Sequence, residues 1–365
     1  MDKKINKIYV IVFGILFFGI SFFAWFKPAD DFSYTERRHL DKFPTLNKET
    51  ILSGKFMSEF EEYTLDQFPF RDDFRSIKSI NHLYVFGQKD NNDVYIADGY
   101  VSKIDYPLSE KTMNNAINKF NSIYKKYIDG TDAKVYYSII PDKNCFLAEK
   151  NGYPAYSFES MKEYMNENLS DMKYIDIYDL ISVSDFYYTD THWKQENIID
   201  VAKTLSKEMG VMLEAEYEKV TLDIPFYGVY YGQLGLPMKP DKISYLNNKM
   251  FEECIIVNHE TGKEIPMYSI EKAKGRDPYE MFLSGSISVI TIENPNATTS
   301  KELVIFRDSY GSSLVPLLVE GYSKITMIDA RYINERMIGY YVDFDKQDVL
   351  FIHSSSVINN PIAFK

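Results

Sequence analysis

Two short stretches, far apart in the chain, carry side chains that could form one catalytic site. Asp190 and His192 stand two residues apart, and Ser309 follows residues 302–306, which are apolar enough to form a buried strand. A carboxylate beside an imidazole suits a general base, because the carboxylate fixes the tautomer and stabilises the imidazolium that forms. A serine at a strand-to-helix turn lies at the carboxyl edge of a sheet, near amides that can stabilise an oxyanion. Together these residues predict a Ser-His-Asp site for acyl transfer.

Each stretch also has a plainer interpretation. A D-x-H triplet is often a solvated turn, and a serine after a strand often only marks a crossover. Among the five histidines, His353 is the rival to His192 as base because it ends a predicted strand, but no carboxylate stands near it in the sequence. No Cys/His cluster has metal-ligand spacing and no glycine-rich phosphate loop occurs. We therefore expect no metal, no nucleotide and no other cofactor.

Strands and helices alternate around these residues, which is typical of an α/β fold with a parallel sheet and helices on both faces. We expect strands at 133–140, 174–180, 302–306, 324–329 and 349–353, a hairpin at 93–101, and helices at 109–127, 158–169, 194–209, 309–321 and 334–341. Residues 211–300 break the alternation. They are rich in Tyr, Gly and Pro and contain short β-type runs, which predicts a β-rich insertion.

The N-terminus predicts a membrane anchor. Residues 1–7 hold three lysines, and residues 8–26 are uncharged and strongly apolar. This run is long enough to cross a bilayer as a helix, and no small-residue cleavage pattern follows it. We expect an uncleaved signal anchor with its lysines in the cytoplasm and the body of the protein outside; a cleaved signal peptide is the alternative. The expected domains are a stub and transmembrane helix at 1–27, a linker at 28–50 and a catalytic domain at 51–365.

Composition limits the kinds of partner. The formal charge is −12, and residues 2–7 contribute +2, so the rest of the chain carries −14. An acidic body disfavours nucleic acid and polyanions and favours a neutral or cationic glycan. The apolar content, with 30 Tyr and 25 Phe, excludes a disordered chain. Cys145 and Cys254 are too few for a disulfide framework, and either one bridge or two thiols would fit.

The chain resembles the DHHW proteins and the alginate O-acetyltransferases, which are similar to SGNH (GDSL-like) hydrolases. The resemblance rests on the D-T-H-W stretch, the R-D-S-Y-G turn around Ser309 and the apolar N-terminus. Further matching stretches are 35–40, 54–57, 66–72 and 230–235, so the resemblance extends over most of the chain. Thr191 stands where the DHHW name has a His, as in the alginate enzymes. In SGNH hydrolases the serine comes first and D-x-x-H last; here D-x-H precedes Ser309, the permuted order of these polysaccharide acetyltransferases.

The resemblance implies an SGNH-hydrolase-like (flavodoxin-like) fold and an extracytoplasmic O-acetyltransferase. Ser309 would take up an acetyl group and pass it to a hydroxyl of an exopolysaccharide or cell-wall glycan, with His192 as base and Asp190 as its partner. A membrane-bound O-acyltransferase would supply the acetyl group and is the implied partner. A glycan O-acetylesterase with the same triad, a non-catalytic scaffold of a polysaccharide-export complex and a teichoic-acid acylation factor are the alternatives.

Five further residues are candidates for substrate binding, and each has a structural alternative. Lys143 and Arg331 follow predicted strands and would face the cleft, unless they are a surface lysine and a salt-bridge partner. Tyr231 and Gln233 lie in a tyrosine-rich stretch that would stack on sugar rings and bind hydroxyls, or pack as a hairpin on its own domain. Trp193 would wall the acceptor pocket or pack in the core beside the triad.

Overall fold

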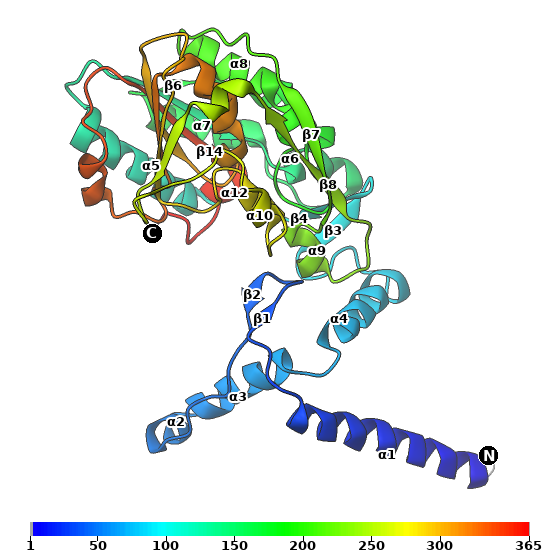
Figure 1. Cartoon of the computed structure of the whole chain (residues 1–365). Coiled ribbons are helices and arrows are strands. Elements are labelled where there is room, and N and C mark those ends of the chain that lie inside the picture. The colour runs from blue at the N-terminus through cyan, green and yellow to red at the C-terminus, as the bar shows by residue number, and fades with distance from the viewer. Residues whose placement is uncertain (1–2, 365) are drawn as a thin grey trace. The chain divides into compact units, whose positions relative to one another are not determined.

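The computed structural model describes residues 3–364, which form two compact units (Figure 1). The N-terminal unit comprises the chain up to Asn92 together with Tyr231–Met238, and the second unit comprises Asp93–Tyr230 and the chain from Lys239 onward. Residues 51–92, which the sequence analysis assigned to the catalytic domain, therefore group with the N-terminal residues. The predicted triad lies wholly in the second unit.

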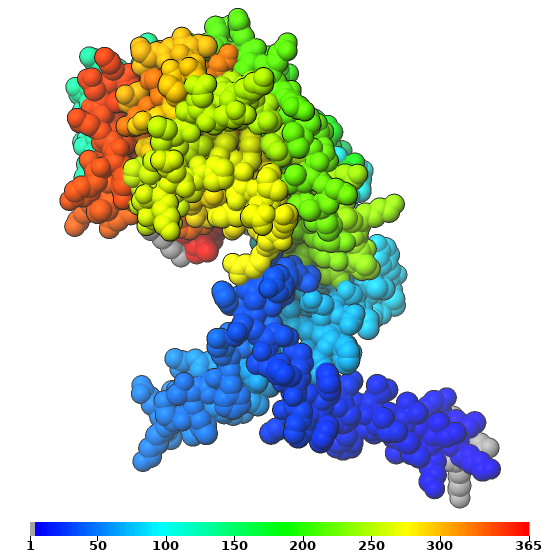
Figure 2. Space-filling model, viewed as in Figure 1, coloured from blue at the N-terminus to red at the C-terminus, as the bar shows by residue number. Residues whose placement is uncertain are grey.

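The N-terminal unit begins with an apolar helix. This helix is α1 (Lys3–Phe26), whose side chains are uncovered in Figure 2. It is long and apolar enough to cross a membrane, a test that an anchor and a signal sequence both pass. The unit continues with β1 (Phe32–Ser33), β2 (Arg38–His39), α2 (Lys48–Leu52), α3 (Lys55–Asp66), α4 (Arg71–Ile80) and a π-helical turn at Asn81–Val85.

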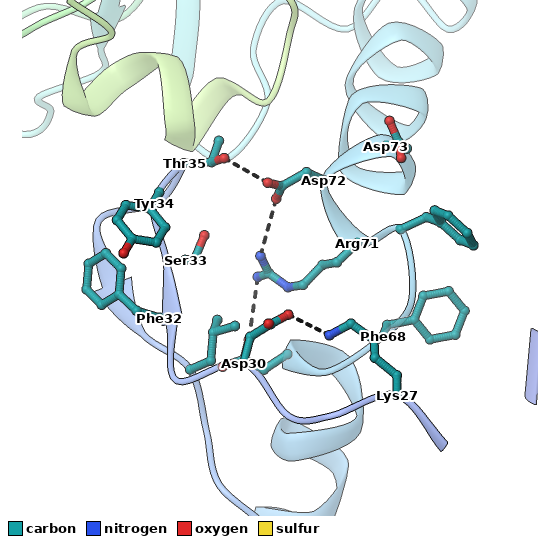
Figure 3. A pocket seen from close by; sticks show the side chains of 13 residues that line it. Lys27, Asp30, Phe32, Ser33, Tyr34, Thr35, Phe68, Arg71, Asp72 and Asp73 are labelled. Atoms are coloured by element: carbon teal, nitrogen blue, oxygen red, sulfur yellow. Dashed lines mark hydrogen bonds and ion pairs between the residues drawn. The ribbon is translucent and has the colours of Figure 1, made fainter. Parts of the chain in front are cut away.

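Two sequence stretches of this unit, 35–40 and 66–72, meet in a network of ion pairs. Arg38 pairs with Asp66, and Arg71 pairs with Glu36. Figure 3 shows Arg71 among the polar side chains that surround it just beyond α1. The network therefore fixes the segment after α1 against the end of α3 and the start of α4. We refer to it below as the ion-pair network.

The helix α9 (Val229–Leu234) contributes its last residues to the N-terminal unit. Ser79 Oγ donates a hydrogen bond of 2.6 Å to the Leu234 carbonyl. A Cβ at Gly232 would lie 1.9 Å from the Thr35 carbonyl oxygen, so no larger residue fits there without movement. This tyrosine-rich stretch was expected to belong to a β-rich insertion; it is helical instead.

The second unit is built on an eight-stranded sheet with the order β10-β9-β11-β13-β12-β14-β5-β6. Its strands are β5 (Lys134–Ile140), β6 (Lys173–Tyr174), β9 (Ile255–Asn258), β10 (Lys263–Glu264), β11 (Val289–Glu293), β12 (Glu302–Arg307), β13 (Lys324–Ile328) and β14 (Asp348–Ser354). Neighbours from β13 to β6 are parallel, and the strands beyond β13 are antiparallel. The mostly parallel sheet is thus as predicted, but strands of the expected insertion at 211–300 extend this same sheet.

Side chains of β12 alternate between the two faces of the sheet. Leu303 and Ile305 join one hydrophobic cluster, and Val304 and Phe306 join the other. The first face is covered by α8 (Ile199–Glu208), α11 (Gly311–Leu314) and a 3-10 turn at Val315–Gly321, and the second by α5 (Glu110–Ile123) and α7 (Phe158–Asn168). Helices therefore cover both faces as predicted, which explains why the strands are apolar throughout.

The connections that follow β12 and β13 run on opposite faces of the sheet, so they diverge beside β12. The chain leaves β12 through α11 on the first face to reach β13. It then leaves β13 through a 3-10 turn at Glu335–Tyr340, which packs on the second face, and enters β14 on the other side of β12. Connections that part in this way mark the place, at the carboxyl ends of the strands, where open α/β sheets bind ligands.

The remaining elements of the second unit are short. They are β3 (Val94–Ala97), β4 (Tyr100–Lys103), α6 (Lys143–Leu147), β7 (Glu218–Phe226), β8 (Asp241–Asn247), α10 (Ile270–Ala273) and α12 (Ser355–Ile358). The predicted hairpin at 93–101 is confirmed: β3 pairs with β4 across Asp98 and Gly99, whose φ angles are 51° and 83°. The predicted strand at 174–180 is wrong after Tyr174. There the Asp176 carboxylate accepts the Tyr178 N–H and turns the chain.

Candidate active site

The structure brings Ser309, His192 and Asp190 into one hydrogen-bonded chain. The Nε2 atom of His192 lies 2.7 Å from Ser309 Oγ, and its Nδ1 atom lies 2.5 Å from Asp190 Oδ1. Ser309 is half-buried at the carboxyl end of β12, where the connections of the sheet diverge. This is the arrangement in which an imidazole can take the proton of a hydroxyl while a carboxylate orients the ring.

Asp190 is fully buried and held by backbone amides. Its Oδ1 accepts the His192 N–H at 3.0 Å, and its Oδ2 accepts the Val229 N–H at 2.8 Å. Next to it, the Asp241 carboxylate accepts the Thr189 hydroxyl and N–H at 2.6 and 2.8 Å. Both carboxylates accept hydrogen bonds from every donor named here, which fixes the loop that carries His192. Asp241 was not predicted from the sequence, because no local pattern connects it to residue 190.

The chain approaches Asp190 so closely that one glycine is required. A Cβ at Gly228 would lie 2.2 Å from the Asp190 backbone nitrogen. The Gly228 N–H donates to Thr189 Oγ1 at 2.9 Å. Any side chain at this position would push the Asp190 loop away from its partners. Gly228 was not predicted as a site residue, and the Tyr-Gly-Val stretch around it was the only local signal for it.

The imidazole of His192 lies flat on a tyrosine ring. Its centroid is 3.8 Å from that of Tyr279, and the two planes differ by 9°. The Tyr279 hydroxyl and Ser313 Oγ lie 2.7 Å apart, and Trp193 Nε1 donates to Ser313 Oγ at 2.9 Å. The stacked Tyr279 ring, held by Ser313, therefore fixes the orientation of the imidazole. Tyr279 lies within the stretch expected to be an insertion, where no helix or strand periodicity marks it.

The turn that carries Ser309 is anchored by Asp308. This carboxylate accepts the Tyr310 N–H at 3.0 Å through Oδ1, and the Ser354 N–H and hydroxyl at 2.7 Å through Oδ2. A Cβ at Gly311 would come within 2.6 Å of Arg307 Cβ. Within residues 3–364 the Ser309 N–H donates to no acceptor. It can therefore donate to an oxyanion that forms beside Ser309 Oγ.

Two of the five predicted binding residues are buried beside the triad. Trp193 is completely buried, which fits the packing alternative and not an open pocket wall. Lys143 is also buried, with Nζ donating to the carbonyls of Val101, Tyr187 and Tyr188 at 2.6, 2.9 and 3.3 Å. Burial lowers its pKa to about 7. Lys143 is thus neither a surface lysine nor an open-cleft residue; it holds the backbone that leads into the triad loop.

The other three predicted binding residues are placed differently. Arg331 donates to both oxygens of Asp329, at 2.8 and 2.7 Å, so the salt-bridge alternative accounts for it. Tyr231 and Gln233 lie in the part of α9 that belongs to the N-terminal unit. A role in substrate binding stays a prediction for these two residues.

The rival base and the cysteines have clear environments. His353 is buried between the rings of Phe120 and Phe364, and neither of its ring nitrogens has a hydrogen-bond partner within residues 3–364. Burial lowers its pKa to about 4. Cys145 and Cys254 are free thiols, so the bridge left open by the sequence is not formed. Across the described residues no group of three or more His, Cys, Asp or Glu side chains could hold a metal ion.

A cavity of about 560 Å³, lined by both polar and apolar side chains, lies at the carboxyl ends of β5 and β14. Tyr230 lines it and donates to Thr191 Oγ1 at 3.1 Å, one residue from His192. Asp142 and Asp105 also line it, and burial raises the pKa of both, to about 7 for Asp142. Asn359 adds an amide that donates to Asp105 at 2.7 Å. A cavity lined in this way offers hydroxyl, amide and carboxyl groups to a polar, uncharged ligand.

Comparison with known proteins shows a shared fold. No protein-family model matches the sequence, and no curated protein sequence matches it. A DHHW family protein from Eubacterium siraeum aligns with a TM-score of 0.61 and 20% identity, over 75% of this chain and 94% of that chain. Bacillus cereus PatB1 aligns with a TM-score of 0.59 and 16% identity, over 74% and 98% of the two chains.

PatB1 has also been solved with a sulfonyl adduct, and that structure aligns with a TM-score of 0.58 and 16% identity, over 74% and 99% of the two chains. At these identities the alignments establish that the fold is shared. One of the proteins that share it is a DHHW family protein, from a family that the sequence motifs resemble.

Proposed function

We propose that this chain is a membrane-anchored, extracytoplasmic O-acetyltransferase that moves an acetyl group through Ser309 onto a polysaccharide. The observation that carries the proposal is the hydrogen-bonded chain from Asp190 through His192 to Ser309. Its position, at the carboxyl end of a central parallel strand where the connections diverge, is where this class of sheet places its sites.

The strand order supports an SGNH-like fold in permuted form. Counted from β12 as first strand through β13, β14, β5 and β6, the parallel strands stand in the order 2-1-3-4-5. That is the order of flavodoxin-like sheets. On this count Ser309 follows the first strand, and Asp190 and His192 follow the last. The count therefore reproduces the order of SGNH hydrolases, in which the serine comes first, although D-x-H precedes the serine in this chain.

The proposed first half-reaction forms an acetyl-enzyme. Ser309 Oγ attacks the carbonyl carbon of the acetyl donor while His192 Nε2 takes the hydroxyl proton. The Ser309 N–H donates to the oxyanion, and Asp190 stabilises the imidazolium through Nδ1. When the tetrahedral intermediate collapses, the bond to the leaving group breaks and His192 returns the proton to that group. The acetyl group then remains as an ester of Ser309.

The second half-reaction transfers the acetyl group. A sugar hydroxyl attacks the ester while His192 takes its proton, and the proton then passes to Ser309 Oγ as the acetylated sugar leaves. The cavity beside Tyr230 could hold the sugar, and its acidic groups favour a neutral or cationic glycan over a polyanion. In this proposal α1 is retained as the anchor, and a membrane-bound O-acyltransferase delivers the acetyl group.

The test uses the full chain in detergent with 4-nitrophenyl acetate, with and without neutral oligosaccharides. We expect slow release of nitrophenol, faster release when an acceptor sugar is present, acetylated sugar, and an acetyl group on Ser309 by mass spectrometry. An aryl sulfonyl fluoride should modify Ser309 and stop both reactions, because such reagents react with activated hydroxyls.

A matched control is Ser312→Ala. Ser312 lies one helical turn beyond Ser309, and its hydroxyl is buried without a partner among the described residues. This variant should keep the rates of the wild type, whereas Ser309→Ala should lose them. Rapid hydrolysis without acetylated sugar, across several acceptors, would indicate an esterase. A chain that neither forms acetyl-Ser309 nor turns over would indicate a scaffold.

A further inference from the structure

The N-terminal unit exposes an apolar surface that the proposed reaction does not use. Beyond α1, the described structure exposes fifteen large hydrophobic side chains in this unit and ten in the much longer second unit. Those of the N-terminal unit are Tyr34, Phe43, Leu46, Ile51, Leu52, Met57, Leu65, Phe68, Phe70, Phe74, Ile77, Ile80, Tyr84, Val85 and Phe86. Exposed apolar surface of this density, rimmed by polar residues, marks a surface for a membrane or a partner.

The helix α3 carries a half-buried aromatic face beside these exposed side chains. Of its residues only Asp66 is buried, although Phe56, Phe60 and Tyr63 share one side of the helix. The ring of Phe43 contacts all three, at centroid distances of 6.2, 5.8 and 5.4 Å. A helix of this length is marginal alone in water, because few hydrogen bonds offset its nucleation. These four rings, called the aromatic face of α3 below, cover one another only in part, and Phe43 remains 59% exposed. An apolar environment would cover the rest of the face.

A ring stack joins this unit to the end of α1. Phe23, in the last turn of α1, stacks on Phe70 with centroids 5.9 Å apart and planes 15° apart. Phe70 has a φ of 57°, a left-handed conformation that costs about 1–2 kcal/mol for a residue with a side chain. Asp66 and Arg71 flank its loop, and the ion-pair network fixes both. The loop between α3 and α4 is therefore held beside the end of α1.

We propose that the aromatic face of α3 lies on the lipid surface at the outer end of α1. The inference rests on α1 being the retained anchor. Phe23 is three residues from the end of α1, so a membrane-spanning α1 brings Phe70 to the level of the lipid headgroups. The helix α3 ends at Asp66, four residues before Phe70, and therefore lies near the same level. Phe and Tyr side chains favour that level.

The charges of α3 indicate how it is held there. It carries Lys55 against Glu59, Glu61 and Glu62, so anionic headgroups would not attract it. Insertion of the aromatic face, and not charge, would keep α3 on the surface. The interaction should therefore persist in zwitterionic vesicles and in high salt.

The test places a tryptophan on each side of α3 in the full chain, reconstituted in phosphatidylcholine vesicles with brominated acyl chains, which quench tryptophan fluorescence on contact. Phe60→Trp replaces one ring of the aromatic face by another, and Ser58→Trp lies on the opposite, exposed side about 160° around the helix. Both are made with Trp25→Phe to remove the fluorescence of α1. The emission of Trp193, which is completely buried in the second unit, is measured in Trp25→Phe alone and subtracted from every variant. The wild type, with Trp25 present and the same subtraction, reports whether α1 is in lipid.

We expect brominated lipid to quench the Phe60→Trp variant at least twofold and the Ser58→Trp variant by less than one fifth, in low and high salt alike. Equal emission with and without bromine in the Phe60→Trp variant, while Trp25 of the wild type is quenched, would overturn the inference and leave the anchor intact. Absence of quenching at Trp25 would overturn both. Neither result bears on the Ser309 reaction, which is measured separately.

Discussion

The two units of this chain treat charged and apolar side chains in opposite ways. In the N-terminal unit, Arg38 is 40% exposed while it pairs with Asp66, the one buried member of the ion-pair network, and large apolar residues stay in contact with solvent. In the second unit, Asp190, Arg307 and His353 are buried inside the core. Polar groups at a surface can exchange partners with water at little cost, whereas buried ones cannot. The first unit is therefore suited to adapt to its surroundings, and the second to hold one geometry.

The largest expected effect comes from the buried triad. His192→Ala should lower turnover on the order of a thousandfold or more, because the members of such a site act as a unit. His353→Ala should leave turnover close to that of the wild type, because that ring faces Phe120 and Phe364. Initial rates with an activated acetyl ester, with circular dichroism as the check on folding, decide between them. Normal rates for His192→Ala and lost activity for His353→Ala would reverse the assignment of the base.

A pair of glycines, four residues apart, tests the separation of the two units. Gly228→Ala should lower turnover about a hundredfold, because a Cβ 2.2 Å from the Asp190 nitrogen must displace the triad loop. Gly232→Ala meets an equally close contact with Thr35, but in the N-terminal unit. It should leave turnover of a small ester unchanged and make the region before Asn92 more sensitive to protease. Equal loss of turnover in both variants would contradict the separation.

The buried imidazole of His353 makes stability depend on pH. Its pKa is lowered from 6.5 to about 4, so the unfolded chain binds more protons between these values. The free energy of unfolding should therefore fall as pH drops from 6.5 to 4, by about 3 kcal/mol from this group. In His353→Leu this part of the dependence should be absent. Urea unfolding of both chains at pH 7 and pH 4.5 measures it, and parallel pH profiles would show that His353 does not contribute.

The smallest effect is expected from Arg38, the exposed partner of buried Asp66 in the ion-pair network. Arg38→Gln should destabilise the N-terminal unit by about 1 kcal/mol at low salt and by less in 1 M salt, because solvent and ions screen the exposed Arg38 and because Arg71 remains 3.5 Å from Asp66. The rate of proteolysis between α1 and Asn92, measured at both salt concentrations, reports the change. A loss that is larger, and the same at both concentrations, would mean that this network behaves like the buried groups of the second unit.

The sequence predicted those parts of the site that depend on local spacing. Asp190 and His192 are two residues apart, and Ser309 follows a strand of alternating core residues, so each could be placed without tertiary information. Tyr279 and Gly228 could not be placed, because they reach His192 and Asp190 from a region without helix or strand periodicity. Such contacts are determined by packing between segments distant in sequence.

The same limit applies to the fold. The apolar strands and their covering helices follow from periodicity, but the pairing of β9, β10 and β11 with the main sheet does not. Periodicity also failed where a side chain redirects the backbone, as Asp176 does at the end of β6. The grouping of residues 51–92 with the N-terminal unit depends on the ion-pair network. The sequence shows that both stretches carry opposite charges, but it does not show which charged residues pair with each other.

The position of β14 has a consequence for how the protein is made. β14 follows every other strand in the chain, yet it lies between β12 and β5, and its Ser354 supplies two hydrogen bonds to Asp308 in the turn of the nucleophile. A chain that crosses a membrane from its anchored end exposes Asp190, His192 and Ser309 before β14 emerges. Until then the central sheet has a gap and the Ser309 turn lacks its support. In the topology and function proposed above, the chain would therefore be an inert precursor until nearly all of it has been exported and folded.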